Sequence, residues 1–247
     1  MRELLTSAIE AAGGEQRWRR ASVLTADVRS GGFLLRSKFK SRVFAEYTVT
    51  ASTGEIRSVL EPYPEPGRRG VFSGDRVHIE TDSGEVLAER DSPREAFMGF
   101  GGRLRHAAWW DDLDALYFAG YAFWNYLNTP FMLTADEIEK REIDPFEADG
   151  ETWRRLEVRF PEGSHTHCRE QTFYFDGEGL LRRHDYAPDV VAPFAQAAHI
   201  SGEHREFDGF TVPTKRRVTP VGPRNRPLRA PLMVWIDVDA LRGIGPE

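Results

Sequence analysis

The sequence predicts a mostly β (α+β) protein: one large curved antiparallel sheet, a half-barrel, plugged by helices. Three observations lead to this prediction. About ten or eleven segments alternate apolar and polar residues with the period of two that strands show. Most of these segments are joined by short turns, such as those at 82–84 and 208–209, which favour hairpins and antiparallel pairing. One long mid-chain segment shows helical periodicity instead.

The central helix is predicted in the most aromatic stretch of the chain, 109–130. Asp111 or Asp112 can cap its start, and Pro130 lies beyond its end. Apolar residues cover nearly all of its faces: Leu113, Leu116, Tyr117, Phe118, Gly120, Tyr121, Phe123, Trp124, Tyr126 and Leu127. A helix that is apolar nearly all round is buried on most sides, so we expect the sheet to wrap around it.

The N-terminal half is expected to form a short amphipathic helix and then a β-meander. The helix contains Leu4, Leu5, Ala8, Ile9 and Ala12, and Gly13-Gly14 ends it. Strands are predicted over 33–38, 43–50, 56–60, 76–81 and 85–89. The proline-rich run 62–67 interrupts the sheet, 92–95 begins a short helix, and the glycine-rich run 99–102 is predicted to be a loop.

The C-terminal half is expected to form a second β-meander. Its strands are predicted over 138–143, 152–160, 169–176, 180–186, 197–207, 210–218 and 232–238, with a turn around 149–150 and an exposed loop over 220–231. Leu156, Val158 and Phe160 should share the buried face of one strand. No break in composition divides the chain, so residues 1–247 are predicted to form one domain.

Composition narrows the function classes. A net charge of −6 argues against general nucleic-acid binding, which needs a basic surface. Cys168 is the only cysteine, so an intrachain disulfide cannot form. The N-terminus lacks the apolar run of a signal peptide, and no segment approaches the roughly 18 apolar residues of a membrane span. We therefore expect a cytoplasmic protein without integral membrane contact.

The chain is predicted to contain, in order, a helix, a β-meander, mid-chain helices and a second β-meander. This order, together with the segments 124–130, 150–161, 171–176 and 180–183, resembles the LolA/LolB half-barrel superfamily of bacterial lipoprotein-carrier proteins. The resemblance implies an incomplete barrel plugged by helices around an apolar cavity. The architecture is also similar to that of the VioE-type enzyme, which implies that such a scaffold can host catalysis. This sequence shows neither the secretion signal nor the lipidation Cys of the carriers.

Aromatic and titratable residues supply the site candidates. The ligand-binding candidates, which could orient a flat apolar molecule, are Trp110, Tyr117, Tyr121, Trp124, Tyr126, His184 and Tyr186. Ordinary core packing is the alternative. Arg182, His184 and Tyr186 are also catalytic candidates, because strand alternation would place them on one face with Leu180, where they could bind an acid or move a proton. An outward polar face is the alternative for this set.

Two further clusters favour structural roles. His165, His167 and Cys168 are zinc-ligand types, but strand geometry would point Cys168 away, so we predict a surface loop and expect no metal. Asp111, Asp112 and Asp114 could act as paired acid–base carboxylates, but acidic residues in a first helical turn are favoured for capping. No cofactor is expected.

The main functional hypothesis is binding of a hydrophobic or amphiphilic small molecule, lipid-like or aromatic, between the sheet and the central helix. It requires an apolar cavity of at least roughly 300 Å³. The first alternative is a cofactor-free enzyme on the same scaffold, acting on an aromatic or acidic small molecule. The second is a protein–protein interaction module that uses strand edges or Trp109 and Trp110, for example in a homodimer.

Overall fold

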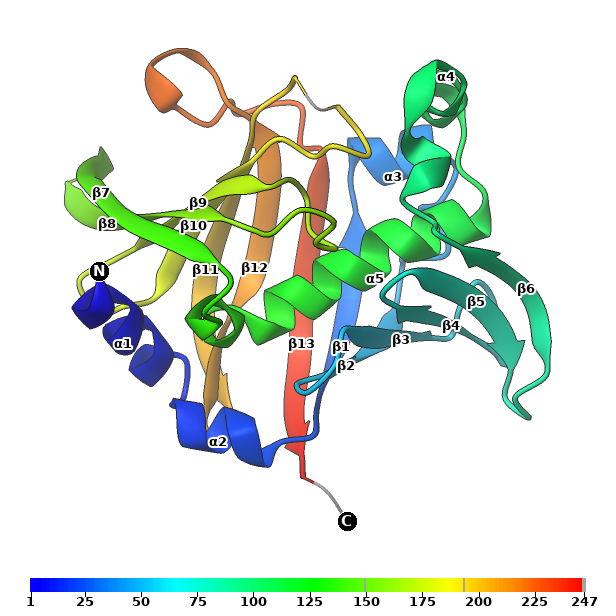
Figure 1. Cartoon of the computed structure of the whole chain (residues 1–247), viewed down its shortest axis with the longest axis horizontal. Helices are drawn as coiled ribbons and strands as arrows, with labels where there is room; N and C mark the ends of the chain where they lie inside the picture. The colour runs from blue at the N-terminus through cyan, green and yellow to red at the C-terminus, as the bar shows by residue number, and fades with distance from the viewer. Residues whose placement is uncertain (149, 193, 246–247) are drawn as a thin grey trace.

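The computed structural model describes residues 1–148, 150–192 and 194–245, and one antiparallel sheet of thirteen strands curves around a long helix (Figure 1). The strand order along the sheet is β6-β5-β4-β3-β2-β1-β13-β12-β11-β10-β9-β8-β7. Two meanders therefore meet where β1 pairs with β13. This arrangement confirms the predicted fold class, a curved antiparallel sheet plugged by helices.

The strands are β1 (Val23–Gly31), β2 (Tyr47–Ser52), β3 (Arg57–Glu61), β4 (Arg68–Ser73), β5 (Arg76–Thr81), β6 (Val86–Asp91), β7 (Glu139–Ala148), β8 (Glu151–Arg159), β9 (Glu170–Phe175), β10 (Leu181–Tyr186), β11 (Ala197–Phe207), β12 (Phe210–Pro220) and β13 (Val234–Ile244). The helices are α1 (Arg2–Ala11), α2 (Glu15–Arg20), α3 (Phe33–Ser37), α4 (Gly99–Ala108) and α5 (Asp112–Asn128), with short 3₁₀ turns η1 (Glu95–Phe97), η2 (Phe131–Thr134) and η3 (Pro223–Asn225).

Helix α5 carries the chain from β6 at one edge of the sheet to β7 at the other, across the concave face (Figure 1). Thirteen of its 17 residues are buried, as its all-round apolar pattern predicts. Its start is fixed by a capping box: the Asp114 backbone N–H donates to Asp111 Oδ1 at 2.7 Å, and the Asp111 N–H donates to Asp114 Oδ2 at 3.0 Å. The capping role predicted for these aspartates is confirmed.

Two glycines let α5 approach the N-terminal meander closely. A Cβ added to Gly120 would lie 2.4 Å from Cβ of Phe72 on β4. A Cβ added to Gly70 on β4 would lie 2.6 Å from Leu116 Cδ1. The Ser58 hydroxyl also donates to the Gly120 carbonyl at 2.9 Å. Helix and sheet are therefore in backbone-level contact here, which larger side chains would prevent.

Several predictions for the N-terminal half are wrong. Most of the segment 33–38, predicted as a strand, forms α3 (Phe33–Ser37). Gly32, at φ +123°, follows the end of β1, and Leu34 and Leu35 both turn inward. The strand expected from residue 43 begins only at Tyr47. The strand β4, which follows the proline-rich run in the sequence, was not predicted. The glycine-rich run 99–102 begins α4 rather than forming a loop, since Gly102 packs against the Ala96 carbonyl with no room for a Cβ.

The C-terminal meander follows the predicted strands closely. Leu156, Val158 and Phe160 are buried on the side that faces the N-terminal helix α1. The β7–β8 turn was predicted around 149–150, and residue 149 lies outside the described part of the chain. The predicted alternation of strand faces fails in β10, where a bulge falls between Leu181 and Arg183.

Candidate functional site

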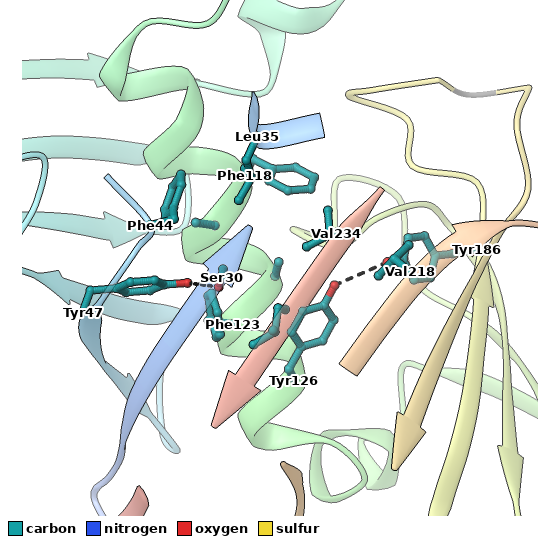
Figure 2. A pocket seen from close by; sticks show the side chains of 13 residues that line it. Ser30, Leu35, Phe44, Tyr47, Phe118, Phe123, Tyr126, Tyr186, Val218 and Val234 are labelled. Atoms are coloured by element: carbon teal, nitrogen blue, oxygen red, sulfur yellow. Dashed lines mark hydrogen bonds between the residues drawn. The ribbon is translucent and has the colours of Figure 1, made fainter. Parts of the chain in front are cut away.

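The space between α5 and the sheet, where a ligand cavity was predicted, leaves a small void. Figure 2 shows side chains that line it. The remaining void is about 30 Å³, close to the volume of one water molecule. Its walls are Ser30, Leu35, Phe44, Tyr47, Phe118, Ala119, Ala122, Phe123, Tyr126, Tyr186, Val218, Val234 and Ile236. The prediction of a ligand-sized cavity at this place is wrong, because the aromatic rings of α5 and the sheet occupy it.

A larger groove, of about 330 Å³, lies along α5 on the open side of the half-barrel. The turn between β2 and β3 forms one wall, and the segments 132–138 and 160–166 form the other. Its apolar lining consists of Trp18, Ile56, Trp124, Met132, Ala135, Ile138, Phe160 and Pro161. This groove falls within the range of ligand sites, roughly 300–1,000 Å³.

Polar side chains in the groove are largely engaged with the protein itself. The Trp124 indole N–H donates to the carbonyls of Ser52 and Glu55, at 3.1 and 2.8 Å. The Trp18 indole N–H donates to Asn128 Oδ1 at 3.0 Å. Asn125 Nδ2 donates to the His165 carbonyl at 2.8 Å. The surface left for a ligand is therefore mainly the faces and edges of apolar side chains.

Behind the groove, a buried network of imidazoles and phenols fills the space between α5 and β10–β12. His167 contacts the hydroxyl of Tyr121 through Nδ1 at 3.2 Å and that of Tyr126 through Nε2 at 2.7 Å. Its ring stacks on Tyr186, with centroids 3.9 Å apart. A neutral imidazole has one N–H and one acceptor, so one of these two tyrosines donates to the ring and the other accepts from it.

His184 and His199 complete this network on the sheet side. His184 Nε2 lies 2.5 Å from Gln171 Oε1, and its ring stacks on Phe173 at 4.2 Å. The His199 ring lies edge-on to Tyr126 at 4.8 Å, and its Nε2 is buried without a hydrogen-bond partner among the described residues. These residues are fully or almost fully shielded from solvent.

Burial sets the protonation states of the network. It lowers the pKa of His167 to about 3 and holds those of His184 and His199 well below the usual value. Burial raises the pKa of Tyr126 to about 12 and that of Tyr186 well above its usual value. At neutral pH these side chains are uncharged.

Comparison with solved structures identifies the fold. A DUF1329 family protein from Desulfovibrio piger aligns with a TM-score of 0.53 at 14% identity, covering 98% of this chain and 92% of that one. The chain shares the fold of this DUF1329 family protein. A LolA superfamily protein from Nitrosomonas europaea aligns at 0.49 with 12% identity, covering 98% and 93% of the two chains. A structure described as an outer-membrane lipoprotein-sorting domain, from Vibrio parahaemolyticus, aligns at 0.48 with 9% identity, covering 95% and 91%.

At these identities the likeness concerns the fold alone. No protein-family model matches the chain, and no curated protein sequence matches it. Among the described residues, no helix combines the length and apolar character needed to span a membrane. The similarity to the VioE-type enzyme stays a prediction.

This fold distributes the predicted ligand-binding residues over five places. Trp124 alone lines the groove. Tyr126 and Tyr186 line the small void, and Tyr121 and His184 belong to the buried network. Tyr117 is buried, and its hydroxyl lies 3.3 Å from Arg94 Nη1 and 3.4 Å from His165 Nδ1. Trp110 is fully buried near the start of α5 against Phe97 and Phe118, and its N–H donates to the His106 carbonyl at 3.1 Å.

The predicted common face of Arg182, His184 and Tyr186 is wrong for Arg182. The bulge in β10 breaks the alternation, so that Leu181 pairs with Phe175 and Arg183 with Tyr174. Arg182 and Arg183 both lie beside aromatic rings: the guanidinium carbon of Arg182 is 6.0 Å from the centroid of the Trp153 ring, and that of Arg183 is 4.9 Å from the centroid of the Tyr174 ring. Only His184 and Tyr186 turn toward α5.

The segment His165–Cys168 is a loop, as predicted, but it is not on the surface. It enters the half-barrel, and His165, His167 and Cys168 are each at most 9% exposed. His165 Nε2 lies 3.3 Å from Asp75 Oδ1, whereas the Cys168 thiol donates to the Glu170 carbonyl at 2.9 Å. These groups point to different partners, and the described residues hold no cluster of three or more metal-ligand side chains.

Sequence reasoning missed most of the groove. Trp18 belongs to the short helix α2, which was not predicted, and Phe160 was predicted only as a core residue. Ile56 was predicted only as the start of a strand. His199 was not predicted as a site residue, and its place beside Tyr126 depends on strand pairing across the sheet.

Proposed function

We propose that this protein binds a hydrophobic or amphiphilic small molecule in the groove along α5. The observation that carries the proposal is a ligand-sized, aromatic-lined groove whose polar groups are largely engaged in internal hydrogen bonds. The proposal keeps the ligand class predicted from the sequence and moves the site from the inner to the outer side of α5.

The groove favours a molecule with a flat or extended apolar body. Trp18 stacks on Phe131 with centroids 5.4 Å apart and an interplanar angle of 10°, which holds its ring rigidly at one end. Trp124 is fixed by its two hydrogen bonds to the β2–β3 turn. Rigid aromatic walls lose little conformational entropy on binding, so they support affinity for aromatic rings or acyl chains.

The polar end of the ligand is expected near His165 and Glu137, the two titratable side chains that line the groove. Burial lowers the pKa of His165, so its imidazole is neutral at pH 7. The neutral imidazole already meets Tyr117 through Nδ1 and Asp75 through Nε2, so it adds no charge to the groove. The carboxylate of Glu137 disfavours an anionic group nearby. We therefore propose an uncharged or cationic polar group.

Binding can be tested with N-phenyl-1-naphthylamine, an uncharged fluorescent reporter, and with neutral long-chain alcohols as competitors. The decisive variant is Ile56→Asp, because Ile56 is 41% exposed at the groove and its replacement should leave the core intact. A carboxylate there should weaken binding of the alcohol by about tenfold or more, since burying an unpaired charge is unfavourable.

Val86→Asp is the matched control, because Val86 is 45% exposed on the edge strand β6 and lies outside the groove lining. It should leave alcohol binding unchanged. Equal weakening by both substitutions, or alcohol binding that Ile56→Asp leaves intact, would refute the groove as the site. As an independent test, native mass spectrometry of the purified protein would show whether a co-purified molecule is lost from the Ile56 variant.

A further inference from the structure

Four segments gather at one end of the half-barrel. They are 32–45 after β1, 98–109 around α4, 187–196 (residue 193 aside) between β10 and β11, and 221–233 between β12 and β13. In an antiparallel sheet with this strand order, the three strand connections emerge at the same end, and Figure 1 shows α3, α4 and these loops together there. We call this surface the basic end.

Direct contacts join the four segments. The Phe33 backbone N–H donates to the Leu232 carbonyl at 2.9 Å, and the Lys38 ammonium donates to the Ala107 carbonyl of α4. Leu34, Val191 and Met233 line one small cavity, which connects α3 with the other two loops. The basic end is therefore one continuous surface.

Large apolar side chains protrude from it. Of the twelve large apolar residues that are exposed among the described residues, seven belong to the basic end. They are Phe33 (47% exposed), Phe39 (79%), Met98 (38%), Leu104 (65%), Trp109 (49%), Phe194 (90%) and Leu228 (40%). Single exposed apolar residues are ordinary, but this concentration at loop tips and on one short helix marks an interaction surface.

The charge of the same segments is strongly positive. They contain nine Lys and Arg residues and one acidic residue, Asp189, although the whole chain has a net charge of −6. Asp189 is paired with Arg94 at 3.0 Å. Six of the arginines are exposed and form no ion pair among the described residues: Arg36, Arg42, Arg103, Arg224, Arg226 and Arg229.

We propose that the basic end docks on the surface of an anionic lipid bilayer. Unpaired arginines provide charge complementarity to acidic headgroups, and protruding Phe, Leu and Trp side chains can enter the boundary between headgroups and acyl chains. A protein partner would need matching hollows for side chains that stand out from several loops, whereas a bilayer accepts them without a fixed shape. The acidic remainder of the chain would keep the opposite end away from the membrane.

Co-sedimentation with vesicles tests this proposal. One set contains phosphatidylcholine alone, and the other contains phosphatidylcholine with a third of phosphatidylglycerol. We expect binding to the anionic vesicles that weakens as salt is added, because salt screens the arginines. Arg36→Glu with Arg103→Glu should lower the partition coefficient by about a hundredfold, and Phe39→Ser with Leu104→Ser should lower it by at least about tenfold.

Two control variants match these changes elsewhere on the surface. Val86→Ser with Leu87→Ser removes side chains that are 45% and 43% exposed on β6, and Arg205→Glu reverses an exposed charge on β11. Neither should alter vesicle binding, and thermal unfolding should show that all variants are folded. Absence of binding to anionic vesicles overturns the proposal, as does an equal loss in the controls. A concentration-dependent dimer that Phe39→Ser with Leu104→Ser dissociates, without vesicle binding, would assign the surface to self-association instead.

Discussion

Replacing Gly120 by Ala should destabilise the protein, although the same change inside an exposed helix is normally favourable. In a helix interior, Ala is better than Gly by roughly 0.5–1 kcal/mol. At this position the new Cβ would lie 2.4 Å from Cβ and 2.8 Å from Cγ of Phe72, both anchored on the buried strand β4. Overpacking of this kind costs about 1–3 kcal/mol, and so short a contact belongs at the upper end of that range.

The net expectation is a loss of about 2 kcal/mol in the free energy of unfolding, or a Tm lower by roughly 4–8 °C for a chain of this length. Urea unfolding and calorimetry would measure it. Gly101→Ala in α4 is the matched control, because a Cβ there meets nothing within 4 Å, and it should be neutral or slightly stabilising. If Gly120→Ala were as stable as the Gly101 variant, the close approach of α5 to β4 would be refuted.

Three further predictions concern the buried polar groups. In the folded protein the pKa values of His167, His184 and His199 lie below the unfolded value of about 6.5, so the unfolded state binds more protons at low pH. The free energy of unfolding should therefore fall as the pH drops below 6.5, by about 1.4 kcal/mol per pH unit for each histidine. Urea titrations at pH 7 and 5.5 measure this difference, and equal stabilities would contradict the prediction. Asp114→Ala should cost about 3 kcal/mol, because it removes the capping box and takes a fully buried carboxylate away from the buried His106 and from Arg90 and Arg105. Asp91→Ala, at an 83% exposed carboxylate, should have little effect. Tyr126→Phe should lower the free energy of unfolding by about 1–3 kcal/mol, because it deprives His167 Nε2 of its hydrogen-bond partner. Thermal melts followed by circular dichroism would measure the change, and an unchanged Tm would refute the hydrogen bond between Tyr126 and His167.

The sequence predicted the sheet and the central helix well because their signals are local. Alternation and hairpin turns define most strands, and Asp111 with Pro130 brackets α5. The failures depend on contacts between distant segments. The segment 33–38 was predicted as a strand with Leu34 and Leu35 on opposite faces, yet both residues are buried in the short helix α3. Arg182 leaves its predicted face because of a single bulge, and nothing in the local sequence reveals a bulge.

The candidate site was predicted less well for a related reason. The aromatic helix was predicted to border a ligand site on its inner side, but side chains fill most of that space, and the groove that we propose as the site lies on its outer side. The groove takes its walls from α2, the β2–β3 turn and two loops of the C-terminal half. Sites assembled from so many segments require the tertiary structure.

The choice of tyrosine or phenylalanine along α5 follows from the buried loop rather than from the sheet. Tyr117 and Tyr121 face the loop His165–Cys168, and their hydroxyls meet its imidazoles, as does that of Tyr126. Phe118 and Phe123 line the small void beside apolar side chains. A loop that enters a core brings polar groups that need partners, since an unpaired buried group costs about 1–3 kcal/mol. The hydroxyls on α5 are therefore explained as the partners that allow this loop to close the inner side of the groove.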